Sequence, residues 1–221
     1  MLDLICFDCD GVLVDSEYLS ACVTVDLFEE NGISISVRQA IELLTGKSQA
    51  ATHALLTREY GSHLADQYQL EHEPRLLSRF HTDLKAIPGV ATLLAGLSTP
   101  CCVTSNSPQN WIRAALTKTR LIHYFGNNIF GMENVKEGKP APDIFFLATE
   151  TFTVQPGNCL VIDDSVTGIL AAKAAGATAI GFCGGSHIQE NHESALFAAG
   201  ADEVCRDMAA FAATLAHFNL H

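Results

Sequence analysis

Four aspartates stand in two short groups, and each group directly follows an apolar run. Asp8 and Asp10 come after LDLICF, while Asp163 and Asp164 come after CLVI. If both runs are strands of one sheet, these carboxylates would converge and repel one another strongly. A hard divalent cation relieves such repulsion, and Mg²⁺ typically binds one or two carboxylates together with water and substrate phosphate. The spacing therefore predicts a magnesium site that handles a phosphorylated compound.

A basic residue and two polar residues stand at comparable places in the chain. Ser105 and Asn106 follow the apolar run CCVT, and Lys139 lies in a loop before a predicted helix. A lysine there would hold a phosphate beside the aspartates and lower the pKa values of their carboxyls. The Ser105 hydroxyl and the N–H groups of the turn after it would bind the remaining phosphate oxygens.

Each of these motifs also has an ordinary structural explanation. An Asp-x-Asp pair is often a turn, and Asp163 with Asp164 could cap a helix before Ser165. Lys139, between a glycine and a proline, could be a solvated loop lysine. Because all of them fall at strand ends or in adjoining loops, the combination favours one site over several unrelated features.

Short apolar runs bounded by turn residues alternate with segments of helical spacing. This alternation predicts a Rossmann-like α/β fold, a parallel sheet flanked by helices. Ligands of such sheets bind beyond the carboxyl ends of the strands, where the polar residues stand. The expected strands are 2–7, 101–104, 159–162, 178–182 and 203–205, and the expected helices are 89–97, 110–118, 143–152 and 167–175.

Residues 16–85 break this alternation. They carry apolar residues three or four positions apart on a polar background, and no segment has the pattern of a strand. We predict an inserted all-helical domain at residues 16–85, with residues 1–15 and 86–221 forming the Rossmann-like core.

Four motifs, in this order, resemble those of the haloacid dehalogenase superfamily, in its phosphatase type with a helical cap. They are FDCDGVLVDSE from residue 7, VTSNS from 103, GKPAPDIF from 138 and VIDDSVTGILAAKAAG from 161. The resemblance covers essentially the whole chain. It implies a Mg²⁺-dependent phosphatase that acts on a small phosphorylated metabolite, a sugar or sugar-acid phosphate. It also implies a monomer whose cap closes over the site.

The resemblance assigns the acidic residues their roles. Asp8 would be the nucleophile that forms an aspartyl-phosphate, and Asp10 would be general acid and then general base. The Asp8 and Asp164 side chains and the Asp10 backbone carbonyl would bind the metal. Asp163 would support these ligands or reach the metal through water.

The remaining residues would bind the substrate. Lys139 would offset the charge of the phosphoryl group and the nucleophile. Ser105 would bind phosphoryl oxygens, with Asn106 supporting it. In the cap, Lys47 and Gln49 would contact the rest of the substrate.

Other activities stay open as alternatives. Halide removal is disfavoured because Asp10 and the paired later aspartates serve phosphate chemistry. A β-phosphoglucomutase resembles the chain, but mutases usually carry a histidine and an arginine where Ser20 and Gln49 stand. Lys47 could be the cap lysine of a phosphonoacetaldehyde hydrolase. A non-enzymatic binding module is the remaining alternative, and it is disfavoured because every required side chain is present.

Composition limits the partners. Of 221 residues 48% are hydrophobic and 17% are charged, which is typical of a globular protein. With 13 Lys and Arg against 25 Asp and Glu, the net charge of −12 argues against a nucleic-acid partner. No signal peptide or membrane segment is recognised, so we expect a cytoplasmic protein without a membrane partner.

The cysteines and histidines lack the spacing of metal sites. Cys6 and Cys9 form a C-x-x-C pair without a second such pair, so we predict reduced thiols in the core. His187 and His192 lie in a loop rich in Gly, Ser and Asn, and no third ligand is evident. We predict that this loop is solvent-exposed.

Overall fold

The computed structural model describes residues 2–44, 47 and 49–218. The chain forms two compact units, one made of Met1–Val14 with Lys85–His221 and the other of Asp15–Leu84. We call them the core unit and the helical unit and describe each by itself.

The core unit contains a six-stranded sheet in which every pair of neighbouring strands is parallel. This confirms the predicted Rossmann-like α/β fold. Ile129–Phe130 was not expected to be a strand, because two residues are too few to show a pattern. The strands are β1 (Leu4–Phe7), β2 (Cys101–Thr104), β3 (Ile129–Phe130), β4 (Cys159–Asp163), β5 (Thr178–Phe182) and β6 (Glu203–Cys205).

The strand order is β3-β2-β1-β4-β5-β6, so the chain changes direction across the sheet at β1. Phe7 at the end of β1 is in register with Val103 of β2 and with Ile162 of β4. The carboxyl ends of these three strands are therefore level. In open α/β sheets this switch point is where ligands bind.

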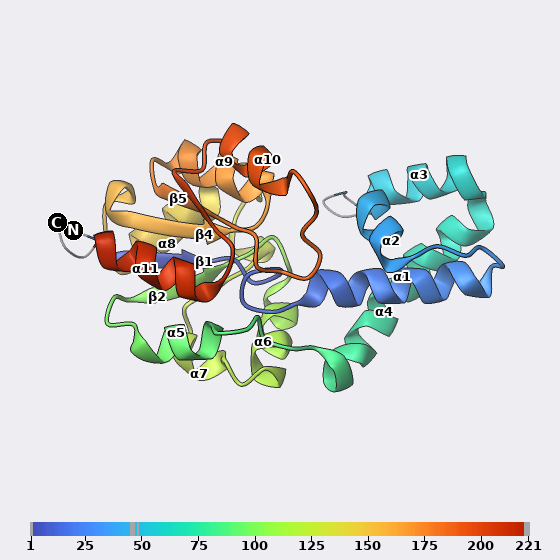
Figure 1. Cartoon of the computed structure of the whole chain (residues 1–221), viewed down its shortest axis with the longest axis horizontal. Coiled ribbons are helices and arrows are strands. Elements are labelled where there is room, and N and C mark those ends of the chain that lie inside the picture. Colours follow the sequence, from blue (N-terminus) through green and yellow to red (C-terminus); the bar gives the residue numbers. More distant parts are fainter. Residues whose placement is uncertain (1, 45–46, 48, 219–221) are drawn as a thin grey trace. The chain divides into compact units, whose positions relative to one another are not determined.

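Helices cover both faces of the sheet (Figure 1). Leu4 and Cys6 of β1 pack with residues of α8 and α9, whereas the Phe7 ring on the opposite face meets Phe125 and Phe211 at centroid distances of 6.1 and 6.0 Å. Successive strand residues point to opposite faces, so β1 is apolar throughout. The helices of this unit are α5 (Val90–Gly96), α6 (Gln109–Lys118), α7 (Ile122–Phe125), α8 (Asp143–Phe152), α9 (Val166–Ala175), α10 (His192–Ala198) and α11 (Met208–Phe218).

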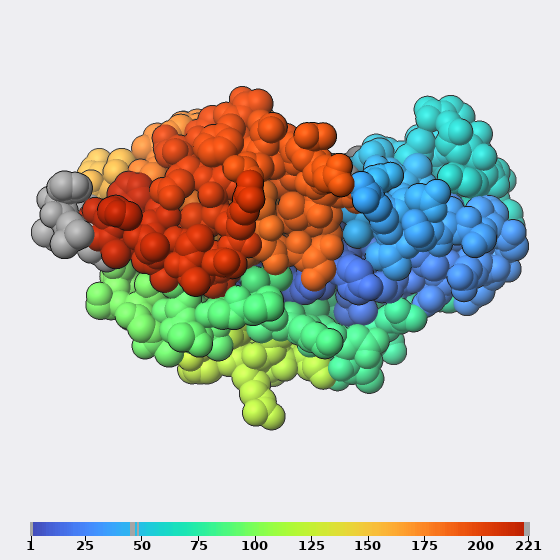
Figure 2. Space-filling view, in the orientation of Figure 1, coloured from blue at the N-terminus to red at the C-terminus, as the bar shows by residue number. Residues whose placement is uncertain are grey.

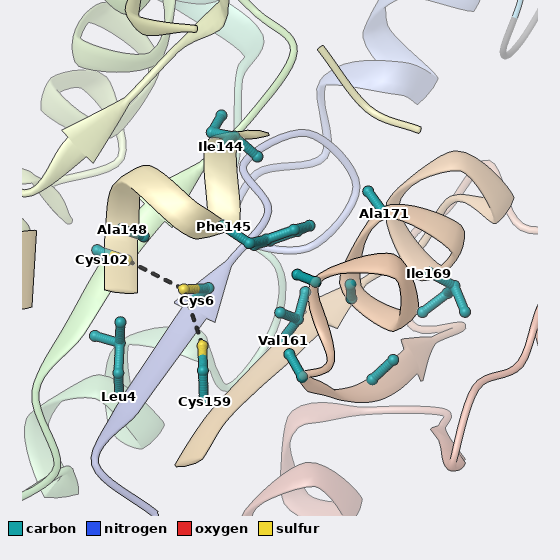
Figure 3. Packing of buried hydrophobic residues seen from close by; sticks show 14 of the residues in the cluster. Leu4, Cys6, Cys102, Ile144, Phe145, Ala148, Cys159, Val161, Ile169 and Ala171 are labelled. Carbon is teal, nitrogen blue, oxygen red and sulfur yellow. Dashed lines mark hydrogen bonds between the residues drawn. The ribbon is translucent and has the colours of Figure 1, made fainter. Parts of the chain in front are cut away.

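The predicted core thiols meet in the middle of the sheet (Figure 3). Cys6 Sγ lies 3.4 Å from Cys102 Sγ and 3.4 Å from Cys159 Sγ. All three are buried and free. The hydrogen bond with Cys102 and burial raise the pKa of Cys6, so the Cys6 thiol stays protonated and acts as a small apolar group.

The last segments of the core unit lie on the face that Figure 2 shows. In Figure 2 the red residues of α11 lie beside the green residues of α5, and these two helices are in contact.

None of the helices in the described ranges combines the length and apolar character that crossing a membrane demands.

The helical unit consists of α1 (Ser16–Glu30), α2 (Val37–Leu44), α3 (Gln49–Tyr60) and α4 (Ser62–Asp83). Its small core is built from one apolar face of each helix, with Phe28 and Leu56 fully buried. As the spacing predicts, its described residues contain helices and no strand.

Candidate active site

Three carboxylates converge at the switch point of the sheet. Asp8 directly follows β1, Asp163 ends β4 and Asp164 follows it. One carboxylate oxygen from each lies within 4.8 Å of the others, and all three side chains are buried. Because every potential ligand here is a carboxylate oxygen, the donor set suits a hard divalent cation.

Lys139 joins two of these carboxylates. Its ammonium group donates to Asp8 Oδ1 at 2.7 Å, to Asp163 Oδ2 at 2.7 Å and to the Thr104 carbonyl at 2.8 Å. Burial alone would lower the pKa of this lysine, but the two carboxylates outweigh burial and raise it. Lys139 is therefore a fixed positive charge, and its three hydrogens are all donated.

The pKa values of Asp8 and Asp164 are governed by burial more than by the predicted effect of Lys139. Burial raises the pKa of Asp8 and of Asp164 well above the usual range, and neighbouring carboxylates raise both further. The charge of Lys139 does lower them, as expected, but its effect is smaller than that of burial. Ionising these carboxyls together is therefore unfavourable in the metal-free protein, and a divalent cation would relieve that cost.

Asn106 holds the loop that carries the lysine. Its side-chain amide donates to the Lys139 carbonyl at 3.0 Å, and its Oδ1 accepts from the Lys139 backbone N–H at 2.8 Å. A Cβ on Gly138 would lie 2.6 Å from Asn106 Oδ1, so glycine permits this close approach. Asn106 thus supports Lys139 through the backbone.

The turn after β2 reaches Asp10. Ser105 Oγ accepts the backbone N–H of Ser107 at 3.0 Å, and Ser107 Oγ donates to Asp10 Oδ2 at 2.6 Å. Ser107 was not among the residues singled out from the sequence. The signal that could have found it is its place in the same Ser-Asn-Ser turn as Ser105.

Asp163 is held on both sides. Lys139 binds Oδ2, while Oδ1 accepts the backbone N–H of Ser165 at 2.9 Å and its hydroxyl at 2.7 Å. Ser165 Oγ also accepts from Gly168 N–H and so caps α9. The sequence suggested that Asp163 and Asp164 could cap this helix, but the N-cap residue is Ser165. Asp163 instead accepts hydrogen bonds from Ser165.

The sequence of the chain matches that of a known protein family. A model described as haloacid dehalogenase-like hydrolase matches residues 2–176. The chain belongs to the haloacid dehalogenase-like hydrolase family. The resemblance noted in the sequence is thereby confirmed, and the protein is a hydrolytic enzyme of this family.

Related proteins support the assignment of this hydrolase. The 6-phosphogluconate phosphatase of Escherichia coli (strain K12) is 32% identical over 188 residues, which is 84% of this chain and 85% of that protein. A haloacid dehalogenase-like protein from Agrobacterium tumefaciens is 38% identical with a TM-score of 0.91, covering 99% of this chain and 100% of its own. A family hydrolase from Deinococcus radiodurans, solved with bound phosphate and sodium, is 31% identical with a TM-score of 0.87, covering 99% and 97%.

Gly168 of the hydrolase lies against Asp163, and Gly168→Ala is expected to destabilise the fold. A Cβ there would lie 1.9 Å from Asp163 Cγ, so the carboxylate must leave its bonds to Lys139 and Ser165. We expect the free energy of unfolding to fall by about 1–3 kcal/mol, the usual cost of overpacking. Gly96→Ala in α5, where a Cβ meets open space, is the control and should be neutral or stabilising. Urea unfolding of both variants tests this, and equal stability would contradict it.

The two cap residues predicted to contact substrate belong to the helical unit. Lys47 is exposed, and its backbone N–H donates to the Leu44 carbonyl at 3.2 Å. Gln49 is exposed at the first position of α3. Their role in binding substrate stays a prediction.

The prediction that the loop with His187 and His192 is solvent-exposed is wrong for both histidines, although Ser186, Glu190 and Asn191 are exposed. His187 is 5% exposed, and its Nε2 lies 2.7 Å from Asp164 Oδ2. His192 is partly buried, and its Nε2 lies 2.5 Å from the Asp164 carbonyl oxygen. Composition marked the segment as a loop, but it could not show that the loop folds back onto the carboxylates.

Proposed function

We propose that this hydrolase is a Mg²⁺-dependent phosphatase that removes phosphate from a sugar or sugar-acid phosphate through an aspartyl-phosphate. The observation that carries the proposal is the buried Asp8 carboxylate at the switch point, bound by Lys139 and close to two further carboxylates. The 6-phosphogluconate phosphatase relative supports the substrate class, and the phosphate-bound relative supports a phosphate site.

Asp8 attacks the phosphorus while the bond from phosphorus to the sugar oxygen breaks. Asp10, held by the Ser107 hydroxyl, gives its proton to the departing oxygen. Asp10 then takes a proton from water as that water attacks the phosphorus. The second attack releases inorganic phosphate and restores the Asp8 carboxylate.

The other residues hold charge in place during both steps. Lys139 faces Asp8 and offsets negative charge on the nucleophile and the phosphoryl group. The Ser105 hydroxyl would donate to a phosphoryl oxygen, while its Oγ accepts the Ser107 N–H and is held in place by it. The Asp8 and Asp164 side chains and the Asp10 carbonyl would hold Mg²⁺, with Asp163 positioned behind them. The metal, when bound, shields the incoming phosphate from the carboxylates.

We assign the helical residues 16–85 as a cap and residues 1–15 with 86–221 as the catalytic core. The cap would select the leaving group through Lys47 and Gln49 and exclude water during transfer. Within the helical unit, Ser20 lies at the place where a mutase carries histidine, and its hydroxyl is 3.2 Å from His72 Nε2. The absence of the mutase residues at positions 20 and 49 favours hydrolysis.

Phosphate release from a panel of sugar phosphates, sugar-acid phosphates, nucleotides and phosphonoacetaldehyde tests the proposal. We expect release from a sugar or sugar-acid phosphate with Mg²⁺ and none with EDTA. Isomerised sugar phosphate without free phosphate would instead show a mutase. Release that persists in EDTA would contradict the metal requirement.

Without metal, the protein is expected to lose stability as the pH rises above about 4. Burial and neighbouring carboxylates raise the folded-state pKa of Asp8 and Asp164 above the ordinary aspartate value of about 3.9. Stabilisation by the bound protons is complete below that value and is lost as the pH passes the raised pKa values. Mg²⁺ binds the ionised carboxylates, so its thermal stabilisation should grow over the same range.

Melting curves in EDTA and in Mg²⁺ between pH 4 and pH 8 measure this dependence. Asp8→Asn removes one of the two carboxyls whose pKa is raised, so the melting temperature in EDTA should depend less on pH. A Mg²⁺-induced shift that is the same at every pH would contradict the expectation.

A further inference from the structure

Asp164 is the carboxylate of the cluster that Lys139 does not hold. The three hydrogens of the lysine go to Asp8, Asp163 and the Thr104 carbonyl. Asp164 instead meets His187, whose Nε2 lies 2.7 Å from Oδ2. As a metal ligand Asp164 must be ionised, and an ionised carboxylate only accepts hydrogen bonds, so in that state the imidazole Nε2 carries the hydrogen and donates it.

The His187 ring occupies a place shaped by two glycines. A Cβ on Gly11 would lie 2.8 Å from His187 Cε1 and 2.0 Å from Asp164 Oδ2. A Cβ on Gly185 would lie 2.7 Å from both Cε1 and Nδ1 of the ring. Gly11 also has a φ of +78°, which other residues rarely adopt. The backbone on two sides thus fixes where the imidazole stands.

A second histidine from the same segment contacts the same aspartate. His192, the first residue of α10, lies with its Nε2 2.5 Å from the Asp164 carbonyl oxygen. The loop after β5 and the first residue of α10 therefore contact Asp164 at its carboxylate through His187 and at its backbone through His192.

We infer that His187 is a positioning residue for Asp164: it fixes one carboxylate oxygen so that the other is presented to the metal. The inference rests on the proposed function, which makes Asp164 a Mg²⁺ ligand. A carboxylate without such a bond would rotate and lose entropy on binding the cation. Hydrogen bonds to metal ligands typically contribute 10–100-fold to metal affinity.

Direct titration of Mg²⁺ into the metal-free enzyme by calorimetry tests the inference. His187→Phe keeps a ring and removes the donor, so we expect the Kd for Mg²⁺ to rise about 10–100-fold. His187→Gln keeps an N–H donor and should restore most of the affinity. His123→Gln changes an exposed histidine of α7 in the same way and should leave the Kd unchanged.

The outcomes separate this inference from the proposed function. If the wild-type enzyme binds Mg²⁺ and the Phe variant binds it equally well, His187 only packs and the inference is wrong. If the wild-type enzyme binds no Mg²⁺, both ideas fail. If the Phe variant does not fold, the imidazole ¹⁵N resonances of the wild-type enzyme test the inference instead. The resonance that is missing in His187→Gln is assigned to His187. It should shift on addition of Mg²⁺, and no shift would overturn the inference.

Discussion

Asp8→Asn is expected to lower phosphate release by at least about 10⁴-fold, the scale of losing a nucleophile. The amide nitrogen and oxygen of asparagine do not attack phosphorus, so no aspartyl-phosphate can form. The fold should survive the change, because burial and the neighbouring carboxylates already disfavour the charge at Asp8. Steady-state phosphate release with Mg²⁺, on the best substrate of the panel, measures the loss.

Asp202→Asn provides the matched control. Asp202 also pairs with a lysine, Lys173, at 2.8 Å, but that pair is at the surface of the core unit. The control should retain wild-type kcat and KM. A variant at Asp8 that keeps a tenth or more of the wild-type activity while remaining folded would rule out Asp8 as the nucleophile.

The fold was predictable because its signal is local. β1 and β4 are continuous apolar runs ending in aspartates, and such runs are typical of strands buried on both faces. The sheet switch point then follows from chain order and parallel pairing. β3 gave no such signal because its two residues show no periodicity, and α11 gave little because its sequence is apolar around most of the helix.

The acidic residues, the lysine and Asn106 could be found by residue type and position, but the contacts that hold Asp10 and Asp164 could not. Ser107 and His187 touch Asp10 and Asp164 only after distant segments have met. The pKa of Asp8 likewise depends on how deeply the strand end is buried, which no spacing reveals. Sequence patterns thus identify groups that do chemistry, whereas tertiary packing decides what holds and tunes them.

Lys139→Met is expected to be both inactive and unstable. Removing the ammonium leaves Asp8 and Asp163 buried without their cation, and breaking a buried ion pair on one side typically costs about 3–5 kcal/mol. Loss of an oriented charge at the phosphoryl group typically lowers kcat by about 10²–10³-fold. Urea unfolding in EDTA and steady-state kinetics with Mg²⁺ measure the two effects.

Lys173→Met separates burial from charge. The Lys173–Asp202 pair has similar geometry, at 2.8 Å, but both side chains are more than a third exposed. Exposed pairs contribute about 0–1 kcal/mol, so this control should change neither stability nor kcat appreciably. Equal destabilisation by the two substitutions would contradict the argument that burial makes the Lys139 pair critical.

Adding Mg²⁺ to Lys139→Met separates two roles of the lysine, which are offsetting charge and orienting the Asp8 carboxylate. The cation binds the same carboxylates, so it should stabilise Lys139→Met against unfolding more than it stabilises the wild-type enzyme. It should not restore kcat, because the metal does not replace the ammonium at Asp8 Oδ1, which orients the nucleophile. If Mg²⁺ restored stability and kcat together, Lys139 would serve only to offset charge. If it restored stability alone, Lys139 would also hold the nucleophile in its reactive position.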